Sequence, residues 1–124
     1  MDLHHIHAFT AAMQRKHLDD MLVHMADNVA LRTPLAAEPL VGKPAIRPVV
    51  ATLLQVIETI VFREFLEGPV HVAAFFELEA AGTELQGVDY WRLDENGLIQ
   101  EMNVFWRPLP AILAVNSALA AVGR

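Results

Sequence analysis

The stretch from Glu84 to Trp106 places the tightest limit on how this chain can fold. Apolar and polar residues alternate over Glu84–Leu93 and again over Leu98–Arg107, with the turn-forming residues Asp94-Glu95-Asn96-Gly97 between them. Two alternating runs joined by turn residues predict a β-hairpin. A four-residue loop predicts these cross-strand pairs: Leu93 with Leu98, Trp91 with Gln100, Asp89 with Met102, and Gly87 with Val104.

One face of this hairpin is expected to hold a single carboxylate among large apolar side chains, because cross-strand partners share a face. The carboxylate is Asp89, and its expected neighbours are Trp91, Met102, Val104 and Trp106. A tight turn at Ala81-Gly82 joins this hairpin to the preceding strand and adds three residues to the same face: Val72, Ala74 and Phe76.

The remaining elements follow from hydrophobic periodicity. Apolar residues at helical spacing predict a first helix through Phe9, a short second helix from Leu18, a third helix beginning at Pro44 and a terminal helix over 111–122. Residues 28–34, 60–66 and 70–79 are predicted strands. Helices followed by antiparallel strands indicate an α+β fold.

Length and composition limit the possible classes of function. A chain of 124 residues without cysteine, with net charge −6 and no basic cluster, is expected to be one domain spanning 1–124. We expect it to be cytoplasmic, without a nucleic-acid or membrane partner. The hydrophobic fraction of 54% is high for a small monomer and suggests a large apolar cavity or a subunit interface.

The second face of the predicted sheet is also partly apolar. It carries Phe75, Val88, Tyr90 and Phe105. Helices can cover only one face, so a second copy is the natural cover for the other, and we expect a homodimer.

Asp89 is the candidate functional residue. Poor solvation between Ala74 and Met102 would raise its pKa, and a neutral carboxyl in a dry pocket can donate a hydrogen bond to a developing oxyanion. The alternatives are that Asp89 pairs with an arginine such as Arg32, or that it lies at a wet rim.

Histidines at helical spacing, such as His17 and His24, could suggest a metal site. No Asp, Glu or Cys on the same face completes a ligand set, so no metal is predicted, and no cofactor motif is present. His24 is the histidine whose helix would border the pocket. The five methionines are interpreted as core residues.

The order of these segments resembles the nuclear transport factor 2-like superfamily, which includes SnoaL-like polyketide cyclases and ketosteroid isomerase. The matching segments are MADNV, the strand running into Thr33-Pro34, the EP..G loop, and VDYWRLDENGLIQEMNVFW. The resemblance implies a cone-shaped, curved antiparallel sheet wrapped around N-terminal helices, and a pocket inside it.

The comparison with ketosteroid isomerase implies roles for three positions. The aspartate base of that enzyme corresponds to Thr33, its oxyanion-hole tyrosine to Phe9, and its protonated aspartate to Asp89. Threonine cannot abstract a carbon-bound proton at neutral pH. Limonene-epoxide hydrolase has two aspartates that correspond to Val104 and a position near Ala74, whereas SnoaL-like cyclases use a pocket acid–base aspartate.

Two kinds of function remain open. The first is isomerase- or cyclase-type acid–base chemistry by Asp89 on a small hydrophobic molecule. The alternative is a protein that binds such a molecule without turning it over, or an accessory dimerising protein. The expected pocket residues are Phe9, Thr33, Val72, Ala74, Phe76, Trp91, Met102, Val104 and Trp106.

Overall fold

A computed structural model describes residues 1–122 of the chain. The helices are α1 (His4–Gln14), α2 (Leu18–Leu22), α3 (Lys43–Val56) and α4 (Leu109–Val122). The strands are β1 (Met25–Arg32), β2 (Leu40–Val41), β3 (Ile57–Glu67), β4 (His71–Ala80), β5 (Thr83–Leu93) and β6 (Ile99–Arg107). No helix within residues 1–122 has the length and apolar character needed to cross a bilayer.

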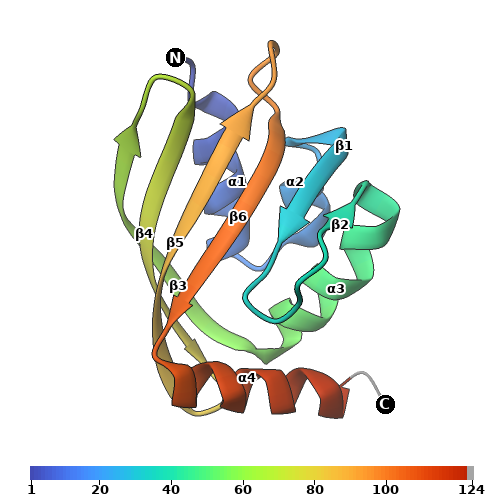
Figure 1. The fold of residues 1–124 in the computed structure, drawn as a ribbon, viewed down its shortest axis with the longest axis vertical. Helices are drawn as coiled ribbons and strands as arrows, with labels where there is room; N and C mark the ends of the chain where they lie inside the picture. The colour runs from blue at the N-terminus through green and yellow to red at the C-terminus, as the bar shows by residue number, and fades with distance from the viewer. Residues whose placement is uncertain (123–124) are drawn as a thin grey trace.

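The strands form one curved sheet in the order β2-β1-β6-β5-β4-β3. The first three helices lie against one side of it, and α4 lies across its lower end (Figure 1). This arrangement confirms the expected α+β fold of helices wrapped by a curved sheet. The sheet is mixed, however, because β1 pairs with β6 in parallel, whereas the sequence led us to expect antiparallel strands throughout.

The hairpin of β5 and β6 forms, but its register differs from the predicted one. Asp89 lies opposite Val104 instead of Met102, and Trp91 lies opposite Met102 instead of Gln100. The Asp94 carboxylate accepts hydrogen bonds from the backbone N–H groups of Asn96 at 2.8 Å and Leu98 at 3.0 Å, so Leu98 belongs to the turn. An irregularity at the next ladder position shifts the pairing by one more residue.

The combined shift is two residues, and this preserves the predicted faces. Side chains alternate with a period of two along a strand, so an even shift leaves each residue on its own side of the sheet. Asp89, Trp91, Met102 and Val104 therefore still share one face. The β4–β5 register agrees with the prediction throughout: Ala74 faces Asp89, Phe76 faces Gly87, and Val72 faces Trp91.

Several boundaries differ from those predicted, because strands take over residues that continue a helical apolar pattern. Strands β1 and β3 begin at Met25 and Ile57, whereas the predicted strands begin at positions 28 and 60. The short strand β2, which pairs with Ala30 and Leu31, was not predicted. The buried core lies between the helices and the inner sheet face, with Trp91, Phe9 and Phe76 as its largest fully buried side chains.

Candidate functional site

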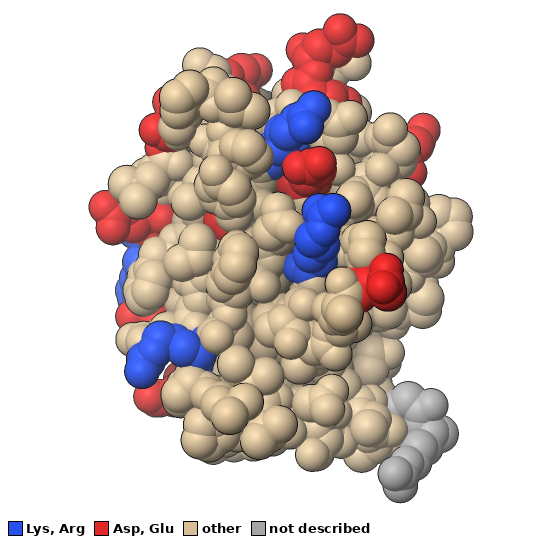
Figure 2. Space-filling model, viewed as in Figure 1, with Lys and Arg blue, Asp and Glu red and all other residues tan. Residues whose placement is uncertain are grey.

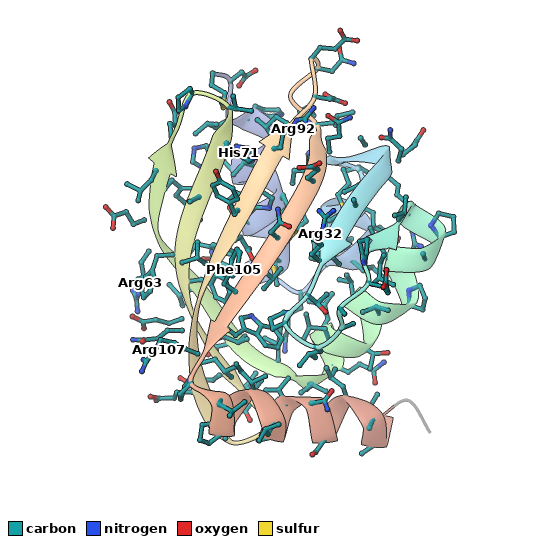
Figure 3. The ribbon with its side chains drawn as sticks, viewed as in Figure 1. Arg32, Arg63, His71, Arg92, Phe105 and Arg107 are labelled. Atoms are coloured by element: carbon teal, nitrogen blue, oxygen red, sulfur yellow. The ribbon has the colours of Figure 1, made fainter. Side chains whose placement is uncertain are left out.

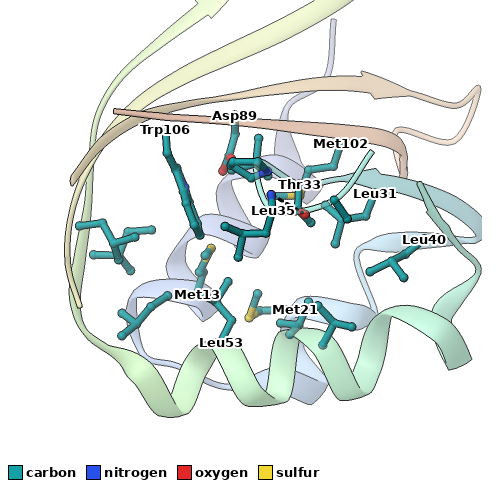
Figure 4. A pocket seen from close by; sticks show the side chains of 18 of the residues that line it. Met13, Met21, Leu31, Thr33, Leu35, Leu40, Leu53, Asp89, Met102 and Trp106 are labelled. Atoms are coloured by element: carbon teal, nitrogen blue, oxygen red, sulfur yellow. Dashed lines mark hydrogen bonds between the residues drawn. The ribbon is translucent and has the colours of Figure 1, made fainter. Parts of the chain in front are cut away.

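A cavity of about 230 Å³ lies between the inner sheet face and α3. Figure 4 shows the Asp89 carboxyl projecting from the sheet into this space, with Trp106 on one side and Leu53 of α3 opposite. The wall is almost entirely apolar. The lining residues are Phe9, Met13, Met21, Met25, Leu31, Thr33, Pro34, Leu35, Ala36, Glu38, Leu40, Val49, Val50, Leu53, Ile57, Ile60, Phe76, Leu78, Asp89, Met102, Val104, Trp106 and Leu119.

Asp89 is the buried ionisable group of this wall. Its side chain is fully enclosed, with 1% of the residue exposed, and neither carboxyl oxygen hydrogen-bonds to any protein atom within residues 1–122. Desolvation by burial raises the pKa of the Asp89 carboxyl well above its usual range. This shift favours the neutral carboxylic acid over the carboxylate, and the neutral form has one O–H to donate.

Neither of the alternatives for Asp89 applies in this structure. Arg32 is exposed at the end of β1 and makes no ion pair with Asp89 within residues 1–122 (Figure 3). Asp89 is also too deeply buried to lie at a wet rim. Among the described residues this carboxyl is buried without a counter-ion, and this is the main electrostatic feature of the site.

The structure separates the expected pocket residues into two groups. Those that line the cavity with Asp89 are Phe9, Thr33, Phe76, Met102, Val104 and Trp106. Val72, Ala74 and Trp91 are buried but do not line it. Trp91 instead packs among aromatic rings, edge-on to Phe9 and stacked with Phe65 at 6.5 Å between ring centroids. These three side chains therefore lie on the inner sheet face without reaching the cavity.

Thr33 and Phe9 lie in the cavity wall, at the positions that the resemblance assigned to a base and a tyrosine. The Thr33 hydroxyl accepts a hydrogen bond from the backbone N–H of Leu35 at 3.3 Å, so it serves the local turn. Phe9 is fully buried and has no polar group. Of the three compared positions, Asp89 alone brings an ionisable side chain to the cavity.

Several lining residues were not among those expected. Met13, Met21 and Met25 were interpreted as core residues, and they form part of the cavity floor. The connection between β1 and β2 contributes Pro34, Leu35, Ala36 and Glu38. Met13 lies one helical turn after Phe9 in α1, and this spacing could have indicated that the two side chains share a face. No periodic signal exists for the connection, because its residues belong to no helix or regular strand.

The histidines lie apart from the cavity. His5 and His24 face each other with 2.9 Å between their Nδ1 atoms, and neither lines the cavity. Burial and the neighbouring imidazoles of His5 and His4 lower the pKa of His24, while Asp20 opposes this shift. Over residues 1–122, no group of three or more His, Cys, Asp or Glu side chains is arranged to hold a metal ion.

The chain was compared with known protein families and with solved structures. The SnoaL-like domain matches residues 6–102, which is most of the chain. The chain belongs to the SnoaL-like domain family. This finding confirms the resemblance to the nuclear transport factor 2-like superfamily drawn from the sequence. No curated protein matches this SnoaL-like chain in sequence.

Solved structures with the same fold include a steroid delta-isomerase from Pseudomonas aeruginosa. That protein is 23% identical, with a TM-score of 0.85 over 94% of this chain and 87% of the other. A protein of cystatin-like fold from Silicibacter pomeroyi is 24% identical, with a TM-score of 0.82 over 96% and 87% of the two chains. The epoxide hydrolase/cyclase-like enzyme SalBIII is 19% identical, with a TM-score of 0.73 over 83% and 88%. These similarities show a shared fold.

Proposed function

We propose that this SnoaL-like protein binds a small hydrophobic molecule that carries a carbonyl or hydroxyl group, with Asp89 as the polar anchor. The observation that carries the proposal is the buried carboxyl of Asp89, which has no hydrogen-bond partner among residues 1–122 and lies in a largely apolar cavity wall. A buried polar group without a partner destabilises the empty protein. A ligand oxygen that accepts the Asp89 hydrogen bond would remove that penalty.

The size of the cavity limits the ligand. An engineered apolar cavity of about 150 Å³ in another protein accommodates benzene. The cavity here is about 230 Å³, which suits a bicyclic molecule. Small-molecule sites generally combine an apolar wall with a few orienting polar groups, and this wall has that composition. The related structures named for isomerase and cyclase-like chemistry, a steroid delta-isomerase and SalBIII, support a ligand of this general character.

A matched pair of ligands tests this proposal. α-Tetralone and tetralin share a bicyclic carbon skeleton, and the ketone is their difference. We expect Asp89→Leu to reduce the preference for tetralone over tetralin by about tenfold, since one hydrogen bond contributes roughly 1 to 1.5 kcal/mol. The two dissociation constants can be followed by the fluorescence of Trp106, which lines the cavity, or by calorimetry.

Asp89→Asn is the matched control for this measurement, because its amide can still donate a hydrogen bond without ionising. It should retain most of the preference for the ketone. An unchanged preference in Asp89→Leu would contradict the role of Asp89 as the anchor. If neither ligand binds to the wild type, the proposed function is wrong.

The outer sheet face supports a second proposal, that the protein forms a homodimer. Uncharged side chains cover the middle of β4, β5 and β6, while charged ones lie around them (Figure 2). Phe105 is 59% exposed near the centre of this face, and Phe75 and Tyr90 are also exposed. The His71 ring stacks on Tyr90 with 4.4 Å between centroids. An apolar patch of this kind is typical of an interface between subunits.

We expect Phe105→Glu to convert a dimer into a monomer, because it places an unpaired charge in the contact. Val41→Glu is the matched control, since Val41 has the same 59% exposure but lies on the edge strand β2. Sedimentation velocity over a range of micromolar concentrations measures both. A wild type that remains monomeric at tens of micromolar would contradict the dimer.

A further inference from the structure

Two of the residues that line the cavity are ionisable, and they lie in opposite environments. Asp89 is enclosed, whereas Glu38 is exposed on the connection between β1 and β2. Pairs of carboxyl groups held in such different environments can divide acid and base roles between them. No role follows from the sequence alone for Glu38, since it occupies an irregular segment.

The connection from Thr33 to Pro39 places Glu38 where the cavity meets solvent. Thr33 and Leu35 are half-buried, and the chain then becomes exposed at Ala36 and stays so through Glu38. All four of these residues line the cavity. Within residues 1–122, the Glu38 carboxylate makes no hydrogen bond or ion pair with another side chain. Its carboxylate is therefore available to a molecule in the cavity.

The other polar groups of the wall are poor bases. The Thr33 hydroxyl does not ionise at neutral pH and is bonded to the Leu35 N–H. The methionine sulfurs are weak acceptors. Burial raises the pKa of the Asp89 carboxyl and so favours its protonated form, which does not act as a base. Among the described residues that line the cavity, Glu38 is the remaining group that can accept a proton from carbon.

We propose that Glu38 is the general base for enolisation of a ketone bound in this cavity, with Asp89 as the hydrogen-bond donor to the ketone oxygen. This inference rests on the proposed function. The Glu38 carboxylate takes a proton from the carbon next to the carbonyl. The electron pair of that C–H bond forms the C=C bond, and the π pair of the C=O bond moves to oxygen.

Charge and atoms balance in this step. The negative charge leaves Glu38 and develops on the ketone oxygen, where Asp89 donates its hydrogen bond or its proton. Return of a proton from Glu38 to the same carbon regenerates the ketone, and return to a conjugated carbon would move the double bond. The implied substrate class is small ketones with an acidic α-hydrogen.

Hydrogen exchange at carbon tests the inference. Wild-type protein should accelerate the loss of the C2 proton signal of α-tetralone in D₂O above the buffer rate. Glu38→Gln should lower this protein-dependent rate by about a hundredfold or more, the usual contribution of a positioned base. The dissociation constant for tetralone should change less than about threefold, because the anchor at Asp89 is intact.

Glu95→Gln is the matched control, because Glu95 is an exposed carboxylate in the β5–β6 turn and does not line the cavity. It should exchange at the wild-type rate. Added acetate should restore exchange in Glu38→Ala, because a free carboxylate can replace the missing base. Acetate would not restore exchange if the role of Glu38 were purely structural.

The possible outcomes separate the two proposals. If tetralone binds with an Asp89-dependent preference but exchanges at the buffer rate, the role of Glu38 is wrong and the binding function stands. Wild-type exchange in Glu38→Gln, or no acetate rescue of Glu38→Ala, would also overturn the role of Glu38. If tetralone does not bind, both proposals are overturned.

Discussion

Asp89→Leu is expected to raise the free energy of unfolding at neutral pH by about 1 to 3 kcal/mol, because it removes a buried polar group that has no hydrogen-bond partner in the described part of the chain. Asp89 lies at the cavity wall, so the larger leucine side chain has space to project into. Urea unfolding followed by far-UV circular dichroism measures the change. If the variant is more stable but no longer prefers a ketone, Asp89 lowers the stability of the protein and is kept for binding.

The pH dependence of stability provides an independent check on Asp89. Its pKa is raised in the folded state, so the folded protein holds a proton that the unfolded chain releases above about pH 3.9. The contribution of this proton to the stability of the folded protein is fully present below that pH. It is lost as the pH rises through the folded-state pKa of Asp89. The stability of the wild type relative to Asp89→Asn should therefore fall as pH rises, because asparagine does not titrate.

Two results would contradict this account of Asp89. One is a strong loss of stability in Asp89→Leu. The other is a carboxyl that titrates near its ordinary pKa of about 3.9 by carbon-13 NMR. Together they would identify Asp89 as the partner of a buried cation.

Gly87→Ala is expected to destabilise the protein by about 3 kcal/mol, at the upper end of the usual range for overpacking. A β-carbon at this position would overlap the ring of Phe76 and lie 2.5 Å from the backbone oxygen of Phe105. The ring could turn, but the oxygen belongs to the neighbouring strand β6 and is held by the sheet. Thermal and urea unfolding measure the effect, and tetralone binding should weaken as well because Phe76 lines the cavity.

Gly68→Ala is the control for Gly87→Ala. Its added carbon would meet one atom within 4 Å, the backbone oxygen of His71 at 3.3 Å, so the change in stability should stay below about 1 kcal/mol. Adding Phe76→Leu to Gly87→Ala should recover part of the loss, because it removes the overlapping ring carbons. Equal stability of Gly87→Ala and the wild type would show that the two strands separate easily at this point.

The sequence by itself determined which residues share a face of the sheet. Alternation along each strand places Asp89, Met102, Val104 and Trp106 together, and only a register error of an odd number of residues would separate them. An error of two residues in the predicted register left that result unchanged. The apolar surroundings of Asp89, and the direction of its pKa shift, follow from the same alternation.

Tertiary structure alone decided which members of that face reach the cavity. Val72 and Trp91 lie on the same sheet face as Asp89, yet neither lines the cavity. Trp91 packs against Phe9 of α1 and Phe65 of β3 instead. Glu38 reaches the same cavity from a segment with no periodicity. Periodic patterns describe neighbours along one element, whereas a cavity forms where elements distant in sequence leave space between them. That space depends on side-chain volumes and on the path of an irregular connection, and neither follows from local sequence.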